Sequence, residues 1–190
     1  LSYRAYSLTK EKKYASFSST FAIMSLAFLI LGIVQILLTT HFSDQLSHLL
    51  TQFDLIFLLH MILLFMAYTS LLLLTYKVTE KKLAALVLGL VLLLSVFSYQ
   101  HYLKFHIVAF ALLFFLALKF YSNFMEKKNY NAKLVFTAFY LLTCAEVFFI
   151  AITFNQTLYI VGALLQVLGY LVLSYVLLRV VNHGRQTRKT

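Results

Sequence analysis

Long apolar runs separated by short polar segments are the dominant pattern of this chain. Six runs stand out, at residues 17–40, 53–76, 83–100, 104–123, 132–154 and 158–180. A bilayer core of about 30 Å requires roughly 20 apolar residues in a helix, so each run is long enough to cross a membrane with some tilt. The pattern predicts an all-α, polytopic transmembrane helical bundle of about six helices, with residues 1–190 forming a single transmembrane domain.

The composition supports this interpretation. The chain is 62% apolar and only 12% charged, whereas a soluble domain is nearer half apolar and a quarter charged. It contains no Pro and five Gly, which favours regular, unbroken helices. No phosphate-binding loop, nucleophile elbow or acidic metal cluster occurs, and the loops leave no room for a soluble catalytic domain. We therefore do not expect an enzyme.

The basic residues are sorted strictly along the chain and predict its orientation. All sixteen Lys and Arg except Lys104 fall in the N-terminal flank, in two alternate connections between runs, or in the C-terminal tail. Short loops rich in Lys and Arg stay on the cytoplasmic side. We therefore expect a multi-pass protein of the cell membrane with both ends of the given chain cytoplasmic. The net charge of +10 reflects this topology and contact with the lipid bilayer, not nucleic-acid binding.

Small and amide residues recur at helical spacing in three of the runs. In lipid, small residues let helices approach closely and amides bond across the contact, so we expect these positions at helix interfaces. They are Ser25, Gly32 and Gln35 in the first run, Ala85 and Gly89 in the third, and Gly162, Gln166 and Gly169 in the sixth.

Four hydrogen-bonding side chains on four different runs are predicted to share one layer in the outer half of the membrane. At 1.5 Å per residue, His60 lies roughly 10 Å below the outer edge, Glu146 and Gln166 about 12 Å, and Gln35 near 7 Å. Leaving an ionisable group alone against lipid is costly, so we expect Glu146 and His60 to come within hydrogen-bond reach, with Gln166 nearby. The layer is either a structural cluster or an outward-facing polar pocket for a ligand or a proton.

Two cofactor alternatives stay open, although no cofactor is predicted. His41, Asp44 and His48 follow a helical spacing that could hold a divalent metal. A haem would need two axial ligands, for which His60 and His106 are the candidates.

Two short segments resemble a known kind of membrane module. They are Tyr3-Arg4-Ala5-Tyr6, followed by Lys10, Lys12, Lys13 and a span starting at Phe17, and Leu165-Gln166-Val167-Leu168-Gly169-Tyr170. Both resemble uncharacterised archaeal and bacterial multi-helix membrane modules, some of which precede histidine-kinase output domains as seven-helix sensors. The resemblance implies a further helix before the first segment. It also implies a sensor role that needs a separate cytoplasmic or membrane partner protein, because this chain has no kinase core.

Three functions follow as hypotheses. The first is a sensor-like or accessory membrane subunit with an outward-facing polar pocket. The second is a small proton- or ion-coupled transporter that uses Glu146, and the third is a membrane haem or redox subunit that uses His60 and His106.

Overall fold

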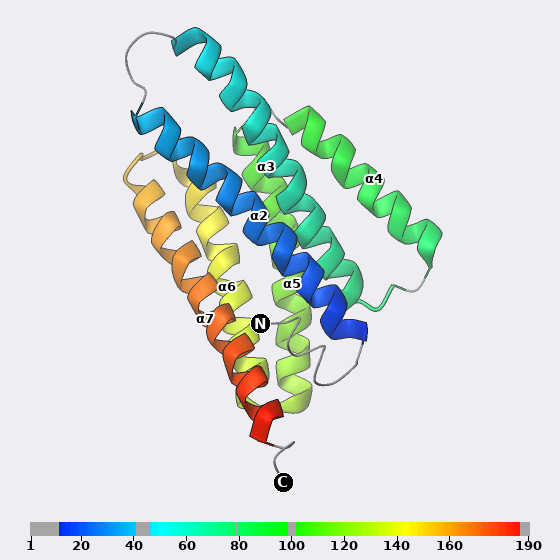
Figure 1. Cartoon of the computed structure of the whole chain (residues 1–190). Helices are drawn as coiled ribbons and strands as arrows, with labels where there is room; N and C mark the ends of the chain where they lie inside the picture. The colour runs from blue at the N-terminus through cyan, green and yellow to red at the C-terminus, as the bar shows by residue number, and fades with distance from the viewer. Residues whose placement is uncertain (1–11, 41–45, 79, 99–101, 187–190) are drawn as a thin grey trace.

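The computed structural model describes residues 12–40, 46–78, 80–98 and 102–186, and within these ranges the chain is helical apart from short connections. The six helices are α2 (Lys12–Thr40), α3 (Leu46–Thr75), α4 (Lys81–Ser98), α5 (Tyr102–Lys127), α6 (Tyr130–Ala151) and α7 (Leu158–Gln186). They run alternately up and down, so that the start of α2 and the end of α7 lie at the same end of the bundle (Figure 1). The predicted all-α helical bundle is confirmed.

Four helices are long and apolar enough to cross a membrane by length and composition. They are the segments Leu55–Thr75, Tyr102–Lys127, Tyr130–Ala151 and Leu158–Arg179, which belong to α3, α5, α6 and α7. This is the architecture of an integral membrane protein. That α2 and α4 also cross the membrane stays a prediction.

The outer surface of the bundle is apolar, as lipid contact requires. Large hydrophobic side chains are exposed on every helix, among them Leu29, Leu86, Phe115, Val147 and Leu164. In water such a surface would drive aggregation, whereas against acyl chains it carries no such cost. The buried core is also largely apolar, so polarity does not separate the inside from the outside in this protein.

Each helix other than α3 packs mainly against one or two other helices. Among the described residues, α7 packs on α6 and α6 on α5, while α2 and α4 both pack on α3. The two groups are joined mainly where α3 packs against α5. Because α5 stands between α3 and α6, a side chain on α6 meets α5 before it meets α3.

Glycines make the tightest contact in the bundle, between α6 and α7. A Cβ built on Gly169 would lie 2.9 Å from the Leu142 side chain and 3.2 Å from the Ala138 carbonyl oxygen. A Cβ on Gly162 would lie 2.9 Å from Phe149. The expected close packing at these two glycines is confirmed, because only a residue without Cβ lets the helices come this near.

The other predicted small-residue faces are not interfaces among the residues that the structure describes. A Cβ at Gly32 or Gly89 would meet nothing within 4 Å, and Ser25 and Ala85 are exposed. Small residues permit close approach without causing it, so their spacing alone did not identify which helix faces are packed.

A two-residue connection holds α5 and α6 side by side. Lys128 adopts the left-handed conformation at φ 48°, which ends α5 without a glycine. Asn129 then caps α6, its side-chain oxygen accepting a hydrogen bond from the Ala132 amide at 2.7 Å. So short a connection makes the two helices antiparallel neighbours along their length.

Candidate functional site

The centre of the site is a buried acid–base pair between α5 and α6. The Nδ1 atom of His106 lies 2.6 Å from the Oε2 atom of Glu146. Both side chains are almost fully enclosed, with exposed fractions of 8% and 2%. A contact this short is a strong hydrogen bond. Either the imidazole N–H donates to the carboxylate, or a protonated carboxyl donates to the imidazole nitrogen.

Aromatic rings surround this pair. The ring centroid of His106 lies 4.1 Å from that of Tyr102, 4.8 Å from Phe105 and 4.9 Å from Phe149. These rings displace water from around the pair and lower the local dielectric, which strengthens its electrostatic interaction. Tyr102 starts α5 and is 41% exposed, so it separates the pair from the end of the bundle.

His60, on α3, is a second buried polar site. Its Nδ1 atom lies 2.8 Å from the carbonyl oxygen of Ala27 on α2. A carbonyl only accepts, so Nδ1 carries the hydrogen, and in the neutral ring Nε2 holds the free lone pair. Phe28, Phe57 and Phe105 pack around the imidazole, with ring centroids 5.6 to 6.3 Å away.

The predicted partnership between His60 and Glu146 is therefore corrected. The structure gives Glu146 to His106 and His60 to the Ala27 carbonyl, with Phe105 in ring contact with both imidazoles. The depth argument placed Glu146 and His60 in one layer, but α5 stands between their helices. His106 lies more than a turn inside α5 and turns inward, which leaves it buried.

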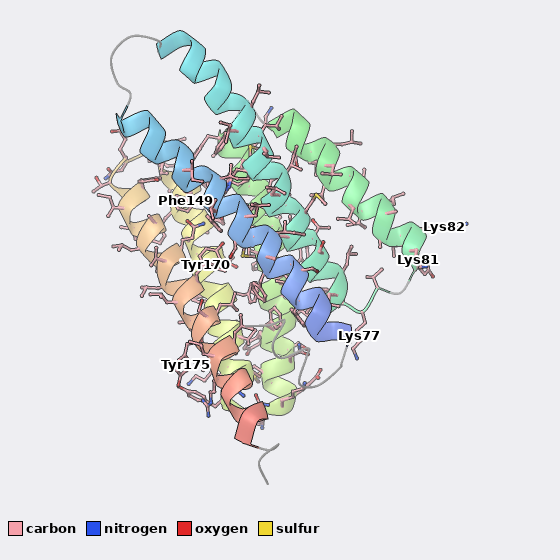
Figure 2. All side chains as sticks on the ribbon, viewed as in Figure 1. Lys77, Lys81, Lys82, Phe149, Tyr170 and Tyr175 are labelled. Carbon is pink, nitrogen blue, oxygen red and sulfur yellow. The ribbon has the colours of Figure 1, made fainter. Side chains whose placement is uncertain are left out.

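A pair of tyrosines forms a third buried polar site, nearer the middle of the bundle. The hydroxyl oxygens of Tyr68 on α3 and Tyr170 on α7 lie 3.1 Å apart. Gln166, one turn before Tyr170, also hydrogen-bonds that hydroxyl. The amide that the sequence singled out therefore belongs to the tyrosine site. Tyr170 packs edge-on against Phe28 at 5.0 Å and thereby touches α2 as well. Figure 2 shows Tyr170 further along the bundle than Phe149, which packs on His106.

Sequence reasoning missed both tyrosines. The signal was present in the sequence, because tyrosine in a membrane helix normally sits at the interface. Tyr68 falls well inside an apolar run, where its hydroxyl needs a partner.

The remaining predicted site residues contribute less. Gln35 belongs to α2 and His48 to α3, but the described side chains do not include them, and His41 and Asp44 fall outside the described residues. Within the described part of the chain no group of three or more metal-ligating side chains is gathered. The metal site at His41, Asp44 and His48 thus stays a prediction.

The haem alternative also stays a prediction, and it would require a change in the packing between the two histidines. His60 and His106 are both buried, but the ring of Phe105 packs against both imidazoles. A porphyrin plane between the two histidines would have to displace that ring.

Comparison with known families, with curated proteins and with solved structures finds no match for this chain.

Proposed function

We propose that this protein is a sensor-like or accessory membrane subunit whose input site is the buried pair of His106 and Glu146. The observation that carries the proposal is the 2.6 Å contact between two ionisable side chains inside membrane-spanning helices. Ionisable groups at such positions are costly to bury and mark functional sites by default. Ordinary helix packing does not require them, since α6 and α7 pack closely at Gly162 and Gly169 against apolar side chains.

The pair has a defined proton chemistry. With Glu146 ionised and His106 neutral, the pair carries one negative charge, and Nε2 of His106 is the free basic atom. Uptake of one proton at Nε2 makes the pair neutral overall and leaves the bond from Nδ1 to the carboxylate in place. A change of one unit of charge in a dry aromatic enclosure alters how strongly α5 is held to α6.

The positions of the buried polar groups favour a sensor function over transport of a substrate. Tyr102, which is 41% exposed, lies between the pair and one end of the bundle, so the pair is close to that end. Beyond Tyr68 and Tyr170, toward the other end, the core continues through apolar side chains, including Leu71, Leu116 and Phe139. Thr20 and Thr69 are also buried in the described core, but neither is ionisable, so no buried ionisable side chain is described beyond the two tyrosines.

The charge distribution supports the proposed position of the site on the outer side of the membrane. Exposed cations gather at the end of the bundle opposite the pair, among them Lys81, Lys128 and Arg179. Positive loops stay cytoplasmic, which puts His106 and Glu146 in the outer half. The proposed output then lies at the cytoplasmic end, where the seven-helix sensor modules that the sequence resembles contact their partners.

Infrared difference spectroscopy at two pH values tests the input site directly. In wild-type protein reconstituted in liposomes we expect carboxyl or imidazole bands that change with pH and that disappear from the difference spectrum in Glu146→Gln. Glu126→Gln is the matched control, because Glu126 is exposed. A wild-type spectrum with no pH-dependent band assignable to Glu146 or His106 would contradict the proposal.

Two further measurements separate sensing from transport. Amide hydrogen exchange at the α5–α6 connection should respond to pH in the wild type beyond the response of Glu146→Gln. A pH dye trapped in the same liposomes should report no Glu146-dependent proton flux. Flux that Glu146→Gln abolishes would replace the sensor with a proton-coupled transporter.

A further inference from the structure

A cluster of lysines projects from the connection between α3 and α4. Lys77, Lys81 and Lys82 are all exposed; Lys81 and Lys82 lie together at the start of α4, and Lys77 lies across the connection at the end of α3 (Figure 2). None of them forms an ion pair within the described part of the chain. Glu80 is the acidic residue among them, so the connection keeps a net positive charge.

The cluster is held by a defined turn and not by a loose loop. Lys77 adopts the left-handed conformation at φ 54°, and the Val78 amide donates back to the Leu73 carbonyl at 3.0 Å. This is the hydrogen-bond pattern of a helix C-terminal cap. The turn therefore fixes the backbone at Lys77, where α3 ends.

A fourth cation joins the cluster from α5. The Tyr76 hydroxyl donates to the Phe115 carbonyl at 3.3 Å, which lays the ring against α5. The Nζ atom of Lys119 lies 5.7 Å from the centroid of that ring. The ammonium of Lys119 thus lies over the ring of Tyr76, the residue that precedes Lys77.

The same corner continues into an exposed apolar surface on α4. Leu83, Leu86 and Leu90 have exposed fractions of 45%, 60% and 53%. Next to them, a Cβ at Gly89 would meet nothing within 4 Å. Cations at the start of the helix and apolar side chains along it match an amphiphile with a charged head and a hydrocarbon chain.

We propose that this corner is a binding site for an anionic phospholipid, with its headgroup phosphate on Lys77, Lys81, Lys82 and Lys119 and an acyl chain along the exposed leucines of α4. A soluble anion or an acidic protein would use the lysines but leave the leucines without a partner. A zwitterionic lipid would use the leucines but has no net charge for four cations to neutralise. The inference concerns a surface separate from His106 and Glu146 and does not depend on their role.

Native mass spectrometry of the whole chain tests this site. Detergent-purified protein is exposed to equal amounts of phosphatidylglycerol and phosphatidylcholine with identical acyl chains. The wild type should retain phosphatidylglycerol preferentially, and the triple variant K77Q/K81Q/K82Q should lose that preference. Each lysine near an anionic headgroup accounts for roughly fivefold in affinity, so the loss should exceed about tenfold.

A matched triple variant separates a site from diffuse attraction. K127Q/K128Q/K133Q removes three exposed lysines from the same end of the bundle but away from the α3–α4 turn. It should retain phosphatidylglycerol as the wild type does. Equal losses in both triple variants, or no loss in K77Q/K81Q/K82Q, would overturn the proposal.

A competition experiment tests whether the acyl chains of the lipid contribute to binding. Excess glycerophosphoglycerol, which is the headgroup without acyl chains, should not displace the bound phosphatidylglycerol. Displacement would show that the lysines bind a soluble phosphate anion and that the α4 leucines play no part.

Discussion

His106 and Glu146 contact one another across the α5–α6 interface, with Nδ1 and Oε2 2.6 Å apart inside a ring of aromatic side chains. This one contact joins the two helices at a depth where water is scarce. It also gives the buried carboxyl group of Glu146 a hydrogen-bond partner, which an apolar surrounding alone would not supply. The predictions below test this contact and the packing around it.

Removing the carboxylate should destabilise the bundle more than replacing it with an amide. Glu146→Ala leaves the Nδ1 atom of His106 without its partner, at a cost of about 1–3 kcal/mol. Glu146→Gln keeps a carbonyl oxygen that accepts from the imidazole and should cost less. For a chain of this size, 1 kcal/mol corresponds to roughly 2–4 °C in Tm. Thermal unfolding in detergent measures both variants, and an unchanged Tm in Glu146→Ala would show that the pair contributes nothing to stability.

Filling the α6–α7 contact should also destabilise the protein. Gly169→Leu forces new atoms against the Leu142 side chain and the Ala138 carbonyl, and such overpacking costs about 1–3 kcal/mol. Gly89→Leu is the matched control, because its Cβ position is open. We expect a lower Tm for Gly169→Leu and little change for Gly89→Leu. Equal behaviour of the two variants would contradict the packing seen at Gly169.

The hydroxyl pair of Tyr68 and Tyr170 should couple α3 to α7 weakly but measurably. Interhelical hydrogen bonds in membrane bundles average about 0.6 kcal/mol in double-mutant cycles. Tyr68→Phe, Tyr170→Phe and the double variant keep the rings and remove only the hydroxyls. Unfolding free energies of the four proteins should give a coupling of about that size. Strictly additive effects would mean that the 3.1 Å contact carries no energy.

The proposed sidedness has a direct chemical test. Lys81 and Gln156 are both exposed and lie at opposite ends of the bundle. In a background without Cys144, an impermeant maleimide should label Gln156→Cys in intact cells. It should label Lys81→Cys only after the membrane is permeabilised. The reverse pattern would invert the topology and place His106 and Glu146 in the cytoplasmic half.

The helical class of this protein could be read from its sequence because run length and bilayer thickness are directly linked. The predicted start of the last run, at residue 158, coincides with the start of α7 at Leu158. Depth counting also singled out His60 and Glu146 as polar side chains deep within their runs, and both are buried in the bundle.

What the tertiary structure decided was the order of neighbours and the rotation of each helix about its axis. His106 became the partner of Glu146 because α5 stands between α3 and α6, and the long side chains of Tyr170 and Tyr68 bring their hydroxyls together between α7 and α3. A soluble helix reveals its buried face through amphipathicity, whereas here apolar residues cover both the lipid-facing and the packed sides. Lipid chains are as apolar as a leucine side chain, so composition alone does not say which face turns inward. Only the packing of the folded bundle made that choice, through the glycines of α7 and the few side chains that needed a hydrogen-bond partner.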